Sequence, residues 1–261
     1  MQSKAYRVTR VRPLGGESFV LEVTGEFPAV RGGQFCMVRT LRDWPVLLSR
    51  PFSYFDVTDD GATLICKAIG PGTRRLAALD PGEEILVTGP LGLGFPAAAE
   101  REPLCIAGGV GIAPFLLWTK ERGAAGGGPV DVLFGGATAA AIVGQDDFCA
   151  TARFHLATDD GSLGFCGNVL GLYDSLIASG TVDAAAPIYC CGPEPMMKAV
   201  ASRAAERGVA CHVSLETYMA CGYGVCNGCS VSVASAGRFV GKRYAKSCIA
   251  GPVFATEELA W

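Results

Sequence analysis

"AGGVGIAP", residues Ala107–Pro114, leaves an apolar run typical of a buried strand and enters a run typical of a helix through a glycine turn. Glycine has no side chain, so the backbone at Gly108, Gly109 and Gly111 can approach a nucleotide closely. The spacing differs from G-x-G-x-x-G, and the turn alone is therefore a weak signal. Its position between strand and helix predicts a nucleotide-binding α/β unit.

The residues around this turn extend the same pattern. From about residue 102, near-continuous apolar runs alternate with helical stretches and loops such as "ERGAAGGGPV". Buried strands separated by helices are typical of a doubly wound parallel sheet. We therefore predict a nucleotide-binding α/β domain over residues 99–215. The expected strands are "EPLCIAGG", "PVDVLFGG", "ARFHLATDDG" and "APIYCCGP", and the expected helices are "IAPFLLWTKERG" and "EPMMKAVASRAAERG".

Residues 1–98 have a different sequence pattern, in which short apolar runs and turn residues recur at intervals of roughly ten residues. This pattern favours an antiparallel six-stranded β-barrel with one short helix, "TRRLAALDPGE", closed by Pro81-Gly82. The expected strands are "AYRVTRVRP", "SFVLEVT", "GQFCMVRT", "PFSYFDV", "ATLICKAI" and "EEILVTGP".

Composition excludes several classes of function. Half of the 261 residues are apolar, 18% are charged and the net charge is −3, so the chain has enough apolar residues for real cores and no basic field. No Lys/Arg cluster indicates a nucleic-acid surface. No apolar segment reaches the length of a membrane span, and the N-terminus lacks the apolar region of a signal peptide. We expect a cytoplasmic protein without nucleic-acid or membrane partners.

Twelve cysteines in such a chain indicate metal, redox or packing roles rather than disulfides. Three of them, Cys221, Cys226 and Cys229, are spaced C-x4-C-x2-C, and Cys248 follows after eighteen residues. This is the spacing of plant-type 2Fe-2S ferredoxins, whereas structural zinc prefers two C-x2-4-C knuckles. We predict a 2Fe-2S segment over residues 216–261. Isolated cysteines in apolar segments are expected to be packing residues: Cys36, Cys66, Cys105, Cys149, Cys166, Cys190 and Cys211.

Two motifs in the first unit have phosphate-binding chemistry. "RPFS", Arg50–Ser53, presents a cation and a hydroxyl at a strand, a combination that suits the pyrophosphate and the ring edge of a flavin. "IGPGT", Ile69–Thr73, opens a helix whose free N–H groups favour a phosphate. Helix capping by Thr73 is the alternative.

Five motifs in order, "RPFS", "GPGT", "GPLGLGF", "AGGVGIAP" and "CGPEPMM", resemble the ferredoxin-NADP reductase superfamily. The resemblance implies an FAD-binding barrel followed by a pyridine-nucleotide domain. It also places Met196 at the start of the helix behind the nicotinamide, although Met196 and Met197 would serve equally well as core residues. The implied FAD residues are Arg50, Pro51, Phe52, Ser53, Lys67, Gly72 and Thr73. The implied nicotinamide-nucleotide residues are Gly108, Gly109, Gly111, Pro114, Cys191 and Gly192.

Combined with the cysteine segment in "LETYMACGYGVCNGC" and "CIAGPVF", this order resembles the electron-transfer subunits of type B dihydroorotate dehydrogenases. The sequence departs from that family at Ala250, where Asp is usual before Gly-Pro. The resemblance implies a partner, an FMN-containing subunit that interconverts dihydroorotate and orotate in pyrimidine biosynthesis. It makes "GYGVCNG" and the C-terminal "FATEELAW" candidates for the interface.

Charge favours NAD over NADP as the nucleotide. "ATDDGSLG" follows the third buried strand and places Asp159 and Asp160 there, with no nearby basic residue after Arg153. A carboxylate accepts a hydrogen bond from a ribose 2′-hydroxyl, whereas a 2′-phosphate needs a cation. The alternative is that Asp160-Gly161 only forms a turn.

Electron counting connects the three cofactors. NADH delivers two electrons, a 2Fe-2S cluster accepts one, and FAD can do both. We expect no catalytic side chain, because His155 and His212 lie in strand-like runs and no nucleophile–base arrangement can be assembled. Two other functions stay open at this point. One is a diaphorase-like subunit of a ferredoxin- or hydrogenase-linked complex, and the other is a zinc-stabilised module without redox activity.

Overall fold

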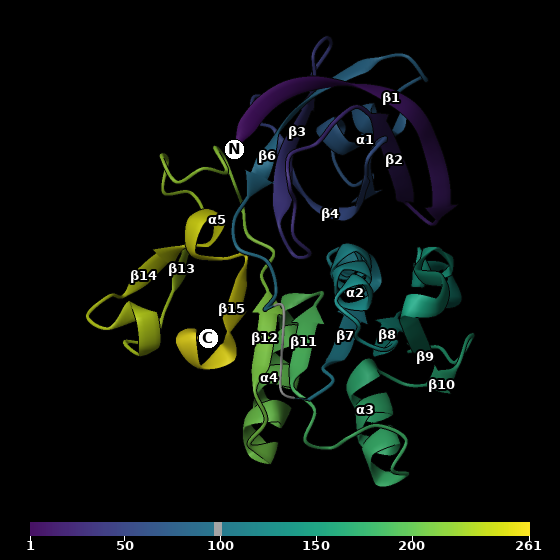
Figure 1. The fold of residues 1–261 in the computed structure, drawn as a ribbon, viewed down its shortest axis with the longest axis vertical. Coiled ribbons are helices and arrows are strands. Elements are labelled where there is room, and N and C mark those ends of the chain that lie inside the picture. Colours follow the sequence, from purple (N-terminus) through teal and green to yellow (C-terminus); the bar gives the residue numbers. More distant parts are fainter. Residues whose placement is uncertain (97–100) are drawn as a thin grey trace.

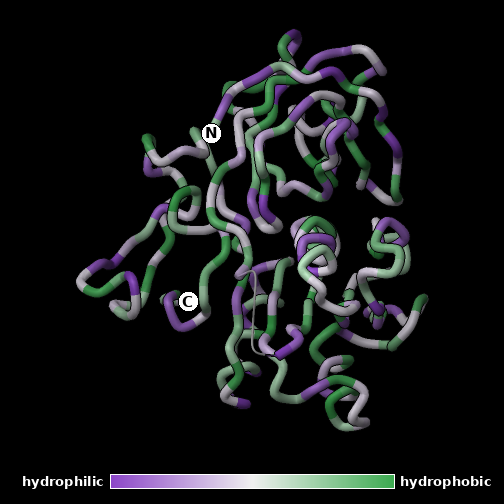
Figure 2. The backbone as a smooth tube through the Cα atoms, in the orientation of Figure 1, coloured by the Kyte–Doolittle hydropathy of each residue, from purple (hydrophilic) through white to green (hydrophobic). Residues whose placement is uncertain are grey.

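The computed structural model describes residues 1–96 and 101–261. Figure 1 shows the N-terminal strands as a curved barrel above an α/β sheet, with the C-terminal segment along one side of both. The predicted domain boundary at residues 98 and 99 lies outside the described residues. Hydrophobic stretches recur in the strands of both units (Figure 2).

All six barrel strands predicted from the sequence are confirmed, and they close in the order β1-β2-β5-β4-β3-β6. Alternate residues of these strands point inward, as in β6, where every second residue is buried. The bounds are β1 Gln2–Gly15, β2 Ser18–Thr24, β3 Phe35–Thr40, β4 Arg50–Thr58, β5 Gly61–Lys67 and β6 Glu84–Leu91.

The short helix of the barrel, α1 (Pro71–Ala77), begins earlier and ends earlier than predicted. Pro71 occupies its first turn, where a missing N–H costs nothing. Beyond Ala77 the chain turns instead, because the Glu83 carboxylate accepts a hydrogen bond from the Asp80 N–H at 2.7 Å.

The second unit is a seven-stranded sheet in the order β10-β9-β8-β7-β11-β12-β15. The predicted doubly wound sheet is confirmed, since one core lies on the face of α3 and α4 and another on the face of α2. The strands are β7 Leu104–Gly108, β8 Val130–Gly136, β9 Ala152–Thr158, β10 Phe165–Cys166, β11 Ile188–Cys191, β12 Cys211–Ser214 and β15 Val253–Ala255. The helices are α2 Phe115–Ala124, α3 Val169–Ala178 and α4 Glu194–Arg207. Short 3-10 turns follow at Gly109–Ile112, Ala139–Ala141, Gln145–Thr151, Gly237–Phe239 and Thr256–Glu258.

Some elements of this sheet differ from the sequence prediction. Helix α2 begins at Phe115, three residues later than expected, and it ends at Ala124, one residue beyond the expected helix "IAPFLLWTKERG". Helix α3 was not predicted, although Asn168 caps it by accepting from the Gly171 N–H at 2.9 Å. The edge strand β15 was also missed, and it pairs antiparallel with β12.

The order in which strands are added to the sheet reverses between β7 and β11, although these two strands are parallel. The chain moves outward through β7, β8 and β9, then returns to place β11 and β12 on the other side of β7. In open α/β sheets, ligands bind outside the carboxyl ends of the strands at such a switch point. Gly108 ends β7 and Cys191 ends β11, so the predicted nucleotide residues meet at this position.

The C-terminal segment is a small unit that leaves the sheet after β12 and returns to it as β15. It contains a hairpin of β13 (Ser230–Ser232) and β14 (Tyr244–Lys246), followed by α5 (Ser247–Ala250). Two hydrogen bonds join the end of this unit to the rest of the chain. The Leu215 N–H, just after β12, donates to the Pro252 carbonyl at 2.9 Å, and the Leu93 N–H, just after β6, donates to the Gly251 carbonyl at 2.6 Å.

The isolated cysteines agree with a packing role at five positions and disagree at two. Cys36, Cys66, Cys105, Cys190 and Cys211 are buried. Cys149 and Cys166 are exposed, because the first lies in a 3-10 turn and the second in the two-residue edge strand β10. Among the helices of residues 1–96 and 101–261, none is long and apolar enough to cross a membrane.

Candidate cofactor cleft and cysteine site

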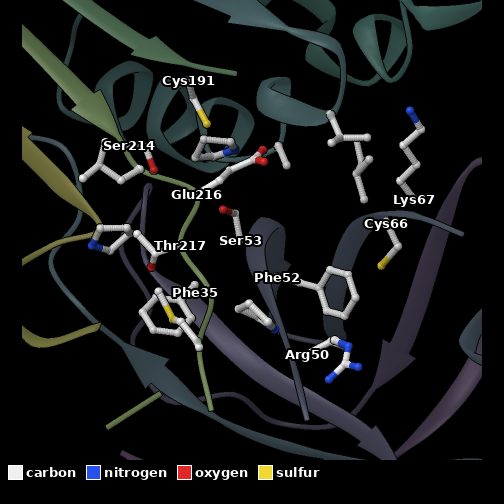
Figure 3. A pocket seen from close by; sticks show the side chains of 18 of the residues that line it. Phe35, Arg50, Phe52, Ser53, Cys66, Lys67, Cys191, Ser214, Glu216 and Thr217 are labelled. Atoms are coloured by element: carbon white, nitrogen blue, oxygen red, sulfur yellow. The ribbon is translucent and has the colours of Figure 1, made fainter. Parts of the chain in front are cut away.

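A cleft of about 280 Å³ opens between the barrel and the carboxyl edge of the sheet. Figure 3 shows Arg50 and Lys67 toward one end of it and Cys191, Ser214 and Glu216 toward the other. The lining comes from both units: Phe35, Arg50, Pro51, Phe52, Ser53, Ile65, Cys66, Lys67, Ile69, Thr73, Val110, Ala113, Pro114, Cys191, Ser214, Leu215, Glu216, Thr217, Met219 and Pro252.

The barrel contributes the predicted "RPFS" motif at the start of β4. Pairing with β3 fixes it, with Ser53 opposite Phe35. The Arg50 guanidinium donates to the Leu48 carbonyl at 2.7 Å, which holds the arginine at the cleft wall while leaving other N–H groups for a ligand. The cleft therefore offers cations at one end and a hydroxyl and a thiol further along. An elongated cofactor with a diphosphate and a ring system fits this polarity.

The start of α1 combines both roles considered for it. The Thr73 hydroxyl accepts from the Gly70 N–H at 3.0 Å, so it caps the helix, and the same side chain lines the cleft. Gly72 does not line the cleft. A Cβ at Gly72 would lie 2.8 Å from the Trp44 ring, so glycine here allows the loop carrying Trp44 to pack down.

The glycine turn after β7 brings two loops together. A Cβ at Gly111 would lie 2.3 Å from the Cys191 carbonyl oxygen, and one at Gly108 would lie 2.7 Å from the Met196 sulfur. Gly109 has a φ of +54°, which favours glycine. Pro114 and Cys191 line the cleft, while Gly108, Gly109, Gly111 and Gly192 are not among its lining residues.

The two methionines of "CGPEPMM" have different positions. Met197 is a fully buried core residue of the α3 and α4 face. Met196 is only partly buried, and its thioether packs against Gly108 and Gly192. The Met196 side chain therefore packs against the glycine turn after β7.

The Cys191 thiol forms an uncharged wall of the cleft. Burial raises its pKa, and nearby Glu216 raises it further, against an opposing hydrogen bond with Ser214. The thiol therefore stays protonated at neutral pH.

Sequence reasoning missed the end of β12 and the segment after it, which together supply a quarter of the cleft lining: Ser214, Leu215, Glu216, Thr217 and Met219. Glu216 is accessible from the cleft, but desolvation by the surrounding protein raises the pKa of its carboxyl, and Lys67 partly opposes this shift. The apolar run "CHVSLE" indicates a strand at β12, but the position of this strand beside Cys191 follows from its long-range pairing with β11.

The four predicted ligand cysteines converge as two pairs. Cys229 and Cys248 are buried, with their sulfurs 3.1 Å apart. Cys221 and Cys226 lie nearer the surface and contact each other. Burial disfavours the Cys221 thiolate, but backbone N–H groups of Cys226, Tyr223 and Val225 and the Cys226 thiol outweigh it and lower the Cys221 pKa to about 6.

Backbone donors surround these sulfurs, as an anionic cluster requires. The Gly228 N–H points at the Cys226 sulfur at 3.4 Å, and the Gly224 N–H points at the Cys248 sulfur. Within residues 1–96 and 101–261, no three Cys, His, Asp or Glu side chains are arranged to hold a single metal ion. Two thiol pairs fit a binuclear cluster with two thiolates per iron better than one zinc ion.

Asp159 and Asp160 lie at the carboxyl end of β9, two strands from β7 along the nucleotide edge. The Asp160 carboxylate accepts from the Ser162 N–H at 3.0 Å and from the Ser162 hydroxyl at 2.6 Å. These hydrogen bonds lower the pKa of Asp160 and form a turn. Neither residue lines the cleft, so their contact with a nucleotide stays a prediction.

The two histidines lie away from the cleft. The His155 ring nitrogen is 2.9 Å from the Asp131 carboxylate on the neighbouring strand β8. His212 on β12 packs edge-to-face against Tyr189.

Comparison with known proteins supports this arrangement. The family model of the iron–sulfur cluster binding domain of dihydroorotate dehydrogenase B matches residues 216–260. The electron transfer subunit of dihydroorotate dehydrogenase B (NAD(+)) from Geobacillus kaustophilus is 37% identical over 232 residues, 87% of this chain and 86% of that protein. The same subunit from Shouchella clausii is 35% identical over 268 residues, 99% of each chain.

Two solved structures share the fold. A chain of the NADH-dependent reduced ferredoxin-NADP oxidoreductase, studied for flavin-based electron bifurcation, superposes with a TM-score of 0.84 at 26% identity, covering 98% of this chain and 90% of that one. The ferredoxin reductase of carbazole 1,9a-dioxygenase gives a TM-score of 0.68 at 23% identity, covering 80% and 66%.

The barrel, the doubly wound sheet and the cysteine segment therefore define a flavoprotein reductase with an iron–sulfur unit. The predicted cofactor set of FAD, NAD and a 2Fe-2S cluster is confirmed at the level of the family. The chain belongs to the family of dihydroorotate dehydrogenase B electron transfer subunits.

Proposed function

We propose that this chain passes electrons between NAD(H) and a partner subunit, with FAD in the cleft and a 2Fe-2S cluster on Cys221, Cys226, Cys229 and Cys248. FAD, when bound, exchanges a hydride with the nicotinamide and single electrons with the cluster, chemistry that no side chain supplies. The protein's own part is to bind, orient and insulate these groups.

One observation carries this proposal: the cleft and the cysteine site share a wall. Phe35 and Met219 line the cleft, and both belong to the buried apolar cluster that also contains Cys229 and Cys248. Met37 and Leu91 complete this small apolar cluster. A flavin ring in the cleft and a cluster on the cysteines would therefore be separated by a single layer of side chains, which suits direct electron transfer.

The cleft residues have distinct tasks. Arg50 and Lys67 supply the positive charge that a diphosphate needs. Ser53 and Cys191 lie at the other part of the cleft (Figure 3), where the hydroxyl can donate to or accept from a ring atom and the protonated thiol adds no charge. Val110 and Pro114 keep water from the sheet side.

The nicotinamide nucleotide would enter at the switch point between β7 and β11 and extend toward Asp159 and Asp160. A carboxylate pair repels a 2′-phosphate, so NADH is expected to be strongly preferred to NADPH. Steady-state reduction of a dye with each nucleotide measures the preference. Equal efficiency with both would contradict the role assigned to these aspartates.

The partner would be an FMN-containing dihydroorotate dehydrogenase catalytic subunit. The relatives are named as electron transfer subunits of that enzyme. The loop around the outer thiols is open, with Val225 74% and Tyr223 45% exposed, so "GYGVCNG" offers an apolar docking surface. The C-terminal "FATEELAW" offers less, because Phe254 is fully buried and the Lys198 ammonium lies over the ring of the partly exposed Trp261.

A second acceptor deserves the same test. The likeness to a chain of the ferredoxin-NADP oxidoreductase favours a diaphorase-like role in a larger complex. Purification of the native complex with cofactor analysis distinguishes the two, since only the first brings an FMN subunit that oxidises dihydroorotate. The cytoplasmic location expected from the sequence stays a prediction.

Replacement of a surface ligand tests the proposed order of the cofactors, in which FAD lies between NAD(H) and the cluster. Cys226→Ser is expected to leave NADH-to-dye reduction by the flavin largely intact and to abolish transfer to the partner. Cys149→Ser, at an exposed cysteine outside the four, is the matched control and should leave both reactions unchanged. Equal loss of both reactions in Cys226→Ser would show that the cluster does not lie downstream of FAD.

A further inference from the structure

The two stretches that form the cysteine site contain almost no charge. Residues 217–236 include no Asp, Glu, Lys, Arg or His, and residues 244–256 include one charged residue, Lys246. A 2Fe-2S cluster with four thiolate ligands is an anion. Lys246 is therefore the one countercharge that these two stretches supply.

The structure holds Lys246 against the cysteine loop. Its ammonium donates to the Gly224 carbonyl at 2.6 Å, and Gly224 lies between Cys221 and Cys226 in the chain. The N–H of the same glycine points at the Cys248 sulfur. The ammonium is thus directed into the loop that surrounds the sulfurs.

The backbone of Lys246 is fixed as well. Lys246 pairs with Ser230, the residue after Cys229, in the β13–β14 hairpin. The next residue, Ser247, donates its N–H to the Cys229 carbonyl at 3.0 Å. Among the described residues, no carboxylate lies within ion-pair distance of the Lys246 ammonium.

We propose that Lys246 is a positioning residue that sets the reduction potential of the cluster. One-electron reduction adds one negative charge to the site, and a fixed cation in partly buried surroundings stabilises that added charge. Lys246 therefore raises the potential of the cluster and favours its reduction by either neighbouring flavin. The cluster exchanges the electron with FAD on one side and with the partner on the other, and no proton or other reactant is needed. This inference rests on the proposed cluster.

The alternative role for Lys246 is structural, since its hydrogen bond also holds the loop. Variants that keep or remove the positive charge distinguish the two roles. Lys246→Arg keeps the charge and a donor, whereas Lys246→Gln keeps a donor without the charge. Lys246→Met keeps only the apolar stem and serves as a second uncharged variant.

The test is a redox titration of the holoprotein followed by the electron paramagnetic resonance signal of the reduced cluster. Lys246→Gln is expected to move the midpoint to a more negative value, Lys246→Arg to stay near the wild type, and the FAD midpoint to stay unchanged in both. Lys242→Gln, in the exposed turn before β14, removes the same charge and is expected to have little effect.

Three results would overturn the inference. One is a wild-type midpoint in Lys246→Gln at full cluster content, and another is an equal shift in Lys246→Arg and Lys246→Gln. The third is loss of the cluster from both uncharged variants while Lys246→Arg retains it, which would assign Lys246 to assembly instead. A wild-type protein without any 2Fe-2S signal would contradict the proposed function itself, which is a different failure.

Discussion

The cleft and the cysteine site are neighbours that are built in opposite ways. The cleft gathers its lining from both domains and from the segment after β12, and it presents the charged groups Arg50, Lys67 and Glu216. The cysteine site takes three of its four sulfurs from nine consecutive residues and surrounds them with backbone N–H groups. A diphosphate needs converging cations, whereas thiolates need local N–H donors, so the first site depends on tertiary packing and the second on loop conformation.

The strongest test of this contrast targets the wall that the two sites share. Met219→Ala removes most of a buried side chain that contacts both, and we expect it to cost about 2–3 kcal/mol of unfolding free energy. It should also slow electron transfer from FAD to the cluster. Met219→Leu conserves volume and should cost less than about 1.5 kcal/mol. Urea unfolding and rapid-reaction kinetics measure the two effects, and equal stability of both variants would refute the shared wall.

A smaller effect is expected from a cation of the cleft. Arg50→Ala should weaken FAD binding by about 10- to 100-fold, the amount typical of a hydrogen bond to a charged group, without loss of iron. Flavin titration and iron analysis check the two halves of this expectation. Arg39→Ala, on the exposed face of β3, is the control. Loss of iron together with FAD would show that the two sites do not assemble independently.

The smallest effect concerns the carboxylate of the cleft. Because the folded-state pKa of Glu216 is raised, the folded protein binds this proton more tightly than the unfolded chain does. The contribution of this carboxyl to the free energy of unfolding therefore increases as the pH falls through its pKa in the folded protein. It reaches its full value below its pKa in the unfolded chain. Glu216→Gln should stabilise the FAD-free protein at neutral pH, within the ~0.5 kcal/mol typical of accessible side chains. Thermal unfolding across pH should show this gain vanishing at about pH 4.

Much of the fold was predictable because its signals are local. The six barrel strands and the four parallel strands expected in the sheet follow from apolar runs and turn residues, and the cysteine spacing indicates a cluster without any knowledge of the fold. The contribution of Glu216 and Met219 to the cleft was not predictable in this way. Their position follows from β12 lying beside β11, a long-range pairing that no short motif encodes. Trp44 was missed for the same reason, since its contact with Gly72 joins a loop to a helix.

The return of the chain as β15 has a consequence for how the partner must be reached. The cysteine segment leaves the sheet after β12 and returns to it as β15, which pairs with β12. The Leu93 N–H, from the barrel unit, also donates to the Gly251 carbonyl just before β15. A unit anchored at both ends cannot swing on a tether as a mobile carrier domain does. The spacing between flavin and cluster is therefore constant, and the partner has to dock at the fixed position of the cysteine segment.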